Sequence, residues 1–168
     1  AYAVVESKGT VVSATVEQGA TLDVGLVVAG NVVSGGTVTS ATVNSGGTLN
    51  AREGGVLSST TASGGIITVS GGGTANDTIV ISGGEIVIGS AGTADETIIS
   101  LGGTEIVSSA GTAIDTTVKD GGSLIVGSEG LLSGVAALED GGSATINSST
   151  GGTISLEGST NTGLTISG

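Results

Sequence analysis

The sequence predicts an all-β protein, a right-handed parallel β-helix (β-solenoid) with about 19 residues per coil, and three observations lead to this fold class. Glycine pairs recur at a fixed spacing, short runs of Val, Ile and Thr lie between them, and large side chains are almost absent. The chain has 168 residues, of which 34 are Gly, one is Tyr and none is Phe, Trp, Met, Cys, His or Pro. A globular core filled by aromatic rings therefore cannot form, and small aliphatic residues must be buried by stacking.

The glycine spacing defines the repeat. Two interleaved sets of glycines keep the same constant step along the chain: Gly65, Gly84, Gly103 and Gly122, and Gly73, Gly92, Gly111 and Gly130. The register is irregular before about Gly30 and beyond Gly152, and the length accommodates about nine units. We expect the glycine pairs to form the corners of the coils, where a positive φ is needed. A flexible Gly/Ser linker is the alternative, but it would lack stacked aliphatic residues.

Each unit holds two runs rich in Val, Ile and Thr, which predicts two strands per coil and no helix. Residues one unit apart should then stack in columns about 4.8 Å apart. The first predicted column is Val43, Thr61, Val80, Ile99, Val118 and Leu138, and the second is Ala51, Val69, Ile88, Val107, Val126 and Ile146. The third is Leu49, Ile67, Ile86, Glu105, Leu124 and Ala144, and Glu105 leaves open whether this strand faces the other way. A half-buried polar column is expected at Thr78, Thr97 and Thr116.

The charge balance excludes several classes of partner. Fifteen acidic residues against three basic ones give a formal net charge of -12, which repels nucleic acids and anionic lipid surfaces. No apolar stretch approaches the roughly 20 residues of a membrane helix, and no signal peptide opens the chain, so we expect a soluble, already processed segment. The absence of Cys excludes disulfides and thiol catalysis.

One acidic column recurs with the repeat, at Asp77, Glu96 and Asp115. We interpret it as solvated surface charge, with weak calcium binding as the alternative. Without His or Cys, acid-base catalysis would have to use carboxylates such as these, and the single aromatic residue, Tyr2, offers no platform for a sugar ring. We therefore expect no catalytic residue, no cofactor site and no metal site. A carbohydrate-active β-helix enzyme that uses these carboxylates is the competing class.

The best copies of the repeat are GGEIVIGSAGTADETIIS from Gly83 and GGTEIVSSAGTAIDTTVK from Gly102. Together with the Thr column they resemble the repeats of AIDA-type self-associating autotransporter adhesins of Gram-negative bacteria, most clearly between Gly35 and Gly142. The resemblance implies that residues 1–168 form a single solenoid domain, a fragment of a longer passenger displayed at the outer membrane. It also implies a role in adhesion, autoaggregation, biofilm formation and virulence. The implied partners are other passenger copies and host or bacterial surface molecules.

The same resemblance implies modification with heptose by a protein O-heptosyltransferase, on Ser or Thr at turns. Five candidate acceptors precede a glycine pair, namely Ser34, Ser45, Ser63, Ser70 and Ser82, and three more form one column, Ser90, Ser109 and Ser128. Serine also favours turns for its own backbone hydrogen bonding, so a purely structural role is the alternative at each position. At the level of function, the alternative to an adhesin is a chain that serves chiefly as a glycosyltransferase substrate.

Overall fold

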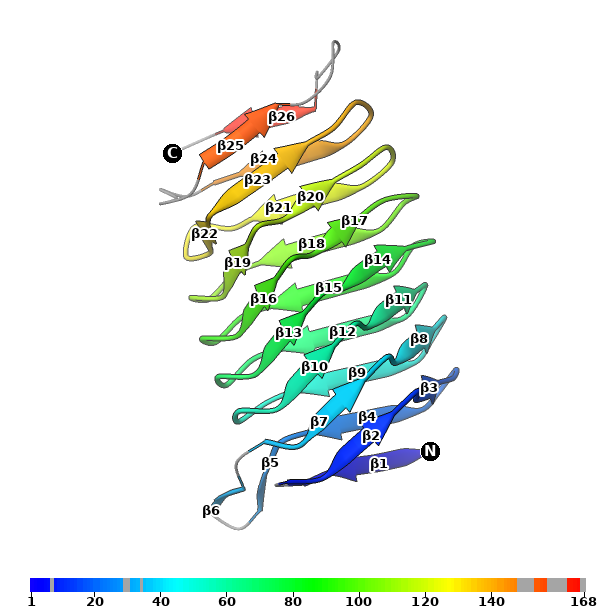
Figure 1. The fold of residues 1–168 in the computed structure, drawn as a ribbon. Coiled ribbons are helices and arrows are strands. Elements are labelled where there is room, and N and C mark those ends of the chain that lie inside the picture. The colour runs from blue at the N-terminus through cyan, green and yellow to red at the C-terminus, as the bar shows by residue number, and fades with distance from the viewer. Residues whose placement is uncertain (7, 29–30, 34, 148–152, 157–162, 167–168) are drawn as a thin grey trace.

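The computed structural model describes residues 1–6, 8–28, 31–33, 35–147, 153–156 and 163–166. Within these residues the regular structure is all β, and parallel strands wind into coils that stack along one axis (Figure 1). The predicted parallel β-solenoid is confirmed, and so is the predicted length of its coils. None of the described residues form a helix with the length and apolarity that crossing a membrane requires.

Three parallel sheets form the three sides of the solenoid. Sheet A consists of β1 (Tyr2–Val5), β4 (Thr21–Val24), β9 (Thr48–Ala51), β12 (Ile66–Val69), β15 (Glu85–Ile88), β18 (Thr104–Val107), β21 (Ser123–Val126), β24 (Ser143–Ile146) and β26 (Leu164–Ile166). Sheet B consists of β2 (Thr10–Val12), β7 (Thr37–Thr39), β10 (Val56–Ser58), β13 (Thr74–Asn76), β16 (Thr93–Asp95), β19 (Thr112–Ile114) and β22 (Leu131–Ser133). Sheet C consists of β3 (Thr15–Val16), β8 (Thr42–Asn44), β11 (Thr61–Ser63), β14 (Ile79–Ile81), β17 (Ile98–Ile99), β20 (Thr117–Val118), β23 (Val135–Leu138) and β25 (Thr153–Leu156).

Each coil therefore has three strands, one in each sheet, and the prediction of two strands was wrong. The stretch interpreted as one run holds two short strands, such as β13 and β14, separated by a bend at Asp77 and Thr78. The prediction of about nine coils was also too high. Among the described residues, seven coils carry all three strands, and β1, β25 and β26 extend sheets A and C beyond them.

The strand register explains where the repeat length varies. Most partners lie one regular coil apart, as Thr74 and Thr93 do. Near the N-terminus Val11 pairs with Val38, a clearly longer step, because the antiparallel hairpin of β5 (Leu26–Val28) and β6 (Asn31–Val33) is inserted between β4 and β7. Figure 1 shows this hairpin projecting from the stack. It accounts for the irregular glycine register before Gly30.

A second irregularity corrects one column of the core. Ala62, not Thr61, pairs with Val43 and Val80. The coil that contains β11 is one residue shorter than its neighbours, and the missing residue falls after β11, at the corner before β12. Thr61 is half-buried, whereas Ala62 is completely buried. The glycine spacing locates this one-residue deletion in the coil but does not say on which side of the strand it falls.

The remaining columns form the core as predicted. The second and third predicted columns are in register along sheet A, and their members are buried. Glu105 points inward with the third column, so this strand does not face the other way. The Thr column is fully buried rather than half-buried. A column that sequence analysis did not identify lies in sheet B: Val38, Leu57, Ala75, Ala94, Ala113 and Leu132.

Glycine pairs occupy most corners between sheets C and A, and others, such as Gly54 and Gly55, lie between sheets A and B. At the corners between sheets C and A, the two glycines of a pair serve different purposes. Gly102 has φ +82°, a conformation in which a side chain is strained. Gly103 lies so close to the coil before it that an added Cβ would be 2.1 Å from the carbonyl oxygen of Val80. One glycine thus makes the bend and the other permits close stacking, which confirms the predicted corner role.

Except at Gly134, the corner between sheets B and C uses residues other than glycine, and sequence analysis did not identify it. One residue per coil adopts positive φ there: Ser13, Ser40, Ser59, Asp77, Glu96, Asp115 and Gly134. The left-handed conformation favours Gly and small polar residues that can bond locally. This requirement explains why the acidic column recurs with the period of the coil.

Candidate functional site

The serine row, defined as Ser90, Ser109 and Ser128, lies along the edge where sheet A turns into sheet B. Ser90 and Ser109 have φ 48° and 49°, and all three residues are exposed. The backbone N–H of Ser90 donates to the carbonyl of Ser109 at 2.7 Å, and that of Ala110 donates to the carbonyl of Glu129 at 2.9 Å. Successive turns are therefore in register, and each of these coils presents one serine of the row.

The other predicted acceptors do not form one equivalent set. Ser45 and Ser82 are exposed at the corner between sheets C and A, and Ser82 has φ 55°. They are not in adjacent coils, because the shortened coil of β11 lies between them. Ser34 lies outside the described residues.

Ser63 and Ser70 differ from the prediction in their position. Ser63 is the last residue of β11 and pairs with Asn44 and Ile81, so it is a strand residue rather than a turn residue. It is half-buried, as is Ser70, which follows β12 at the corner between sheets A and B. The Ser-Gly-Gly sequence therefore occurs in different structural positions, and only exposed serines offer an accessible hydroxyl group.

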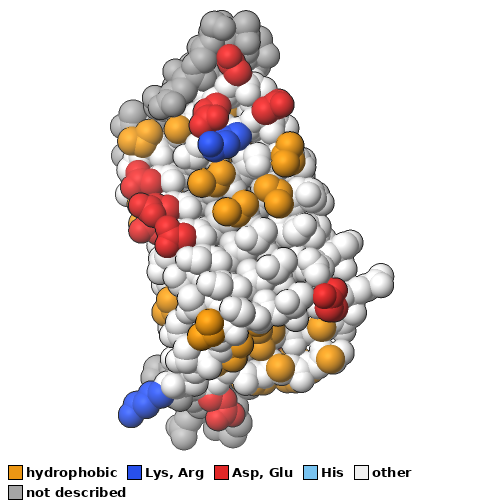
Figure 2. Space-filling model, turned by 45° about the vertical axis from the view of Figure 1, so that its right-hand side comes forward, with side chains coloured by type: hydrophobic (Ala, Val, Ile, Leu, Met, Phe, Trp, Pro, Cys, Tyr) orange, Lys and Arg blue, Asp and Glu red, His pale blue; other side chains and the backbone are white. Residues whose placement is uncertain are grey.

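The acidic groove is an open depression along the corner between sheets B and C. It is lined by Ser59, Asp77, Thr78, Ile79, Glu96, Ile98, Asp115 and Thr117. Figure 2 shows acidic side chains following one another along one edge of the molecule. The groove thus has a carboxylate side, formed by the left-handed residues, and an aliphatic side, formed by Ile79 and Ile98.

The carboxylates of this groove interact with one another. A hydrogen bond with Asp77 raises the pKa of Glu96, and the negative charges of Asp77, Asp95 and Asp115 act in the same direction. Asp115 is held differently, because its Oδ1 accepts a hydrogen bond from the backbone N–H of Val135 at 2.8 Å. Among the residues that the structure describes, no group of three or more Asp, Glu, His or Cys side chains is arranged to hold a metal ion.

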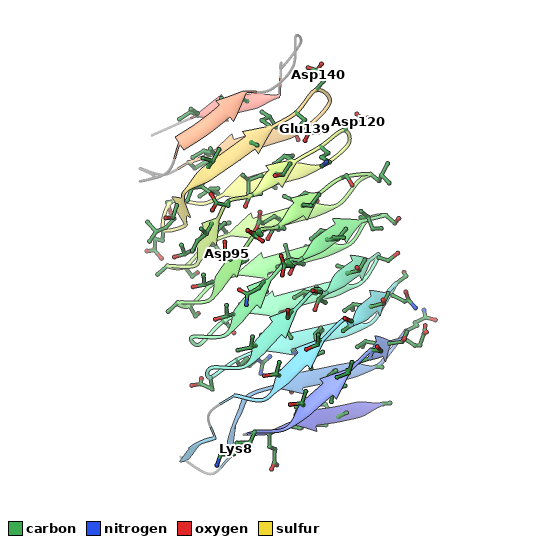
Figure 3. The ribbon with its side chains drawn as sticks, in the orientation of Figure 1. Lys8, Asp95, Asp120, Glu139 and Asp140 are labelled. Atoms are coloured by element: carbon green, nitrogen blue, oxygen red, sulfur yellow. The ribbon has the colours of Figure 1, made fainter. Side chains whose placement is uncertain are left out.

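A second set of acidic residues lies at the glycine corners near the C-terminal end. Figure 3 shows Asp120, Glu139 and Asp140 at the corners that join β20 to β21 and β23 to β24, whereas Asp95 lies on a different edge. Lys119 Nζ lies 3.6 Å from Glu139 Oε1 with both side chains partly exposed, and a surface ion pair of this kind contributes little to stability. Asp120 and Asp140 directly precede the glycine pairs of this corner, the position that Ser45 and Ser82 occupy in earlier coils, so the acceptor hydroxyls are absent there.

One buried polar cluster lies in the first coils. The hydroxyl of Tyr2 donates to Asp23 Oδ2 at 2.7 Å, and Asn50 donates to Asp23 Oδ1. Asp23 and Asn50 are buried, so the hydrogen bonds compensate for the desolvation of the carboxylate. Tyr2 thus contributes to the packing of β1 on β4. The alternation of inward and outward positions assigns Asp23 and Asn50 to the outer face, which is why sequence analysis did not identify the cluster.

No protein-family model matches the chain, and no curated protein matches it. Among solved structures, the chain is similar to the crystal structure of a TibC-catalyzed hyper-glycosylated TibA55-350 fragment. The two sequences are 23% identical, the alignment covers 99% of this chain and 87% of that chain, and the TM-score is 0.47.

Proposed function

We propose that this chain is a rod-like adhesin module, part of a longer autotransporter passenger displayed on the surface of a Gram-negative bacterium and modified with heptose on Ser. The observation that carries the proposal is the serine row, a line of exposed hydroxyl-bearing residues at the corners of a stiff stack of coils. Residues 1–168 form one solenoid domain of this passenger. The chain is not an enzyme in this proposal.

The serine row has the features that an acceptor for a sugar-transferring enzyme needs. Ser90 and Ser109 are on exposed turns, and Ala91 and Gly92 or Ala110 and Gly111 follow them, so a transferase meets no bulky side chain. Ser45 and Ser82 meet the same conditions at the opposite corner. Half-buried Ser63 and Ser70 are the weaker candidates. The enzyme that acts on these residues is a protein O-heptosyltransferase.

Co-expression with a protein O-heptosyltransferase, followed by intact-mass measurement and site mapping by electron-transfer fragmentation, tests the acceptor assignment. We expect additions in steps of one heptose, with Ser90 and Ser109 modified more fully than Ser63. A variant with Ser90, Ser109 and Ser128 replaced by Ala should lose these additions and keep those at Ser45 and Ser82. An unmodified chain, or modification confined to Ser63 and Ser70, would refute the assignment.

Adhesion in this proposal is distributed along the rod. Many weak hydrogen bonds from Ser and Thr side chains and their glycans act together, as multivalent binding allows. The net charge of -12 opposes contact between copies, and salt screens this repulsion over a Debye length of about 10 Å at 0.1 M. Beads that carry the protein should therefore aggregate more readily as ionic strength rises.

The matched control for aggregation is a variant that changes one exposed residue of the serine row at a time. We expect each single replacement to change aggregation slightly and the triple replacement to change it more. A single replacement that abolishes aggregation of a folded rod would contradict a distributed mechanism. Aggregation that is independent of glycosylation would separate the adhesin from the alternative, in which the chain serves chiefly as a transferase substrate.

A further inference from the structure

Glu105 is a carboxylic acid inside an aliphatic column. Its backbone pairs with Ile86 in the preceding coil and with Leu124 in the following coil, and its side chain has 0% exposure. Burial of an ionised carboxylate in such surroundings is strongly unfavourable unless a countercharge is present.

No countercharge reaches Glu105 from the described elements packed against it. All charged residues of the neighbouring strands and corners lie at exposed or half-buried positions outside the core: Glu85, Asp95, Glu96, Asp115, Lys119, Asp120 and Glu129. Asp23 is the other buried acidic residue among those described, and it lies in β4, where it bonds to Asn50 and Tyr2. The groups that do face Glu105 are hydroxyls.

These hydroxyls belong to the buried Thr column. Thr116 Oγ1 donates to Glu105 Oε2 at 2.9 Å. Oε1 of Glu105 has no hydrogen-bond partner, and neither do the buried Oγ1 atoms of Thr60, Thr78 and Thr97. Thr97 is close enough to the carboxyl group to bond to it. A proton on Oε1 makes the acid a donor toward the hydroxyl oxygen of Thr97, while Oε2 accepts from Thr116.

We propose that Glu105 is a neutral acid in the folded solenoid and that its deprotonation makes the coil of β18 a pH-sensitive weak point, held closed in mild acid and prone to local opening above neutral pH. Opening separates β18 from β15 and β21 and frees strand edges, which are able to pair with other chains. This device is independent of the proposed adhesin function.

The direction of the pH effect follows from linkage. Burial raises the pKa of Glu105 from 4.5 to about 7, against the opposing effect of the neighbouring Thr116 and Thr97 hydroxyl groups. Because the pKa is higher in the folded state, the closed form retains the proton between these two values. The stabilisation is complete below the unfolded pKa, decreases as pH rises, and is lost above the folded pKa. These two pKa values correspond to roughly a 70-fold larger opening constant at pH 8 than at pH 5.

Hydrogen exchange of the folded chain, corrected for intrinsic exchange rates, measures this opening. We expect the amides of β15, β18 and β21 to lose about one to two orders of magnitude of protection between pH 5 and pH 8, while those of β9 change less. Glu105→Leu, which continues the aliphatic column, should abolish the difference, and Glu85→Gln, on the outer face of the same sheet, should preserve it. Equal protection at both pH values in the unaltered chain would overturn the proposal.

A second measurement reports the proton itself. Infrared spectroscopy at pH 6 should show the carbonyl band of a protonated carboxylic acid that is lost in Glu105→Gln and retained in Glu96→Gln. A spectrum in which Glu105→Gln removes only carboxylate intensity would show that Glu105 is ionised in the fold, and the proposed switch would then be wrong.

Discussion

Replacing Gly103 by Ala should disturb the solenoid much more than replacing Gly83, although both glycines belong to pairs at equivalent corners of neighbouring coils. A Cβ at Gly103 would lie 2.1 Å from the carbonyl oxygen of Val80, well below the 3.0 Å that real Cβ contacts respect. Relief requires the two coils to separate locally by about 1 Å. That movement would break the hydrogen bond from the Ser100 N–H to the same carbonyl, now 3.0 Å long.

The magnitude follows from these losses. A net backbone hydrogen bond contributes about 1 kcal/mol, and a buried carbonyl left without a partner costs about 1–3 kcal/mol, so we expect Gly103→Ala to lower the free energy of unfolding by about 3 kcal/mol. Gly83 has φ +76° and nothing within 4 Å of an added Cβ, so only the backbone conformation is strained, at about 1 kcal/mol. Ala91 and Ala110 already adopt positive φ in this chain.

Urea unfolding followed by circular dichroism measures both variants, with the slope of the transition as a check that the same surface unfolds. The expected result is a difference of about 2 kcal/mol between Gly103→Ala and Gly83→Ala. If the two variants were equally stable, or if Gly103→Ala were neutral, the close approach of successive coils at this corner would be incorrect, and with it the explanation of why the pairs contain two glycines.

Two further predictions concern the core and the acidic groove. Ile99→Ala removes a completely buried column member and should lower the free energy of unfolding, measured with urea, by about 3 kcal/mol. Ile98→Ala, next to it but 37% exposed, should lower it by less than about 1 kcal/mol. Equal losses would mean that the strand is wrongly oriented. Asp77→Asn should lower the pKa of Glu96 in a carboxyl NMR titration, because it removes the largest cause of the raised pKa, and Asp95→Asn should lower it less. A pKa that is raised in the fold makes unfolding more favourable as pH rises from the unfolded to the folded value. Asp77→Asn should therefore also flatten the pH dependence of stability in this range. An unchanged Glu96 titration would mean that the two carboxyl groups are not neighbours.

Much of the architecture could be predicted because the repeat leaves a strong trace in the sequence. The glycine pairs give both the period and the corners, and the two aliphatic columns of sheet A follow from alternation along the strand. The bend at Asp77 was missed because its positive φ is carried by Asp, Glu and Ser rather than by Gly. The two short strands on either side of it therefore looked like one run.

The errors in register have a local physical cause. Counting from glycine to glycine places the deletion of the β11 coil only to within one unit, so Thr61 was assigned to the column that Ala62 occupies. The same shortening makes Ser63 a strand residue rather than a corner residue. A Ser-Gly-Gly sequence therefore does not define one environment, and exposure separates Ser82 and Ser90 from Ser63.

The amino-acid sequence by itself determined the stacking principle, because a chain with almost no large side chains and a glycine pair in nearly every coil can bury its Val, Ile and Leu only against copies of the same coil. It also determined which corners contain glycine and which outer positions carry charge. The tertiary structure alone decided that three sheets rather than two enclose the core, that Glu105 lies inside it, and that the Thr column is fully buried. These features depend on which face of a short strand turns inward, and that is set by the angle of the bend between neighbouring strands rather than by the pattern within one strand.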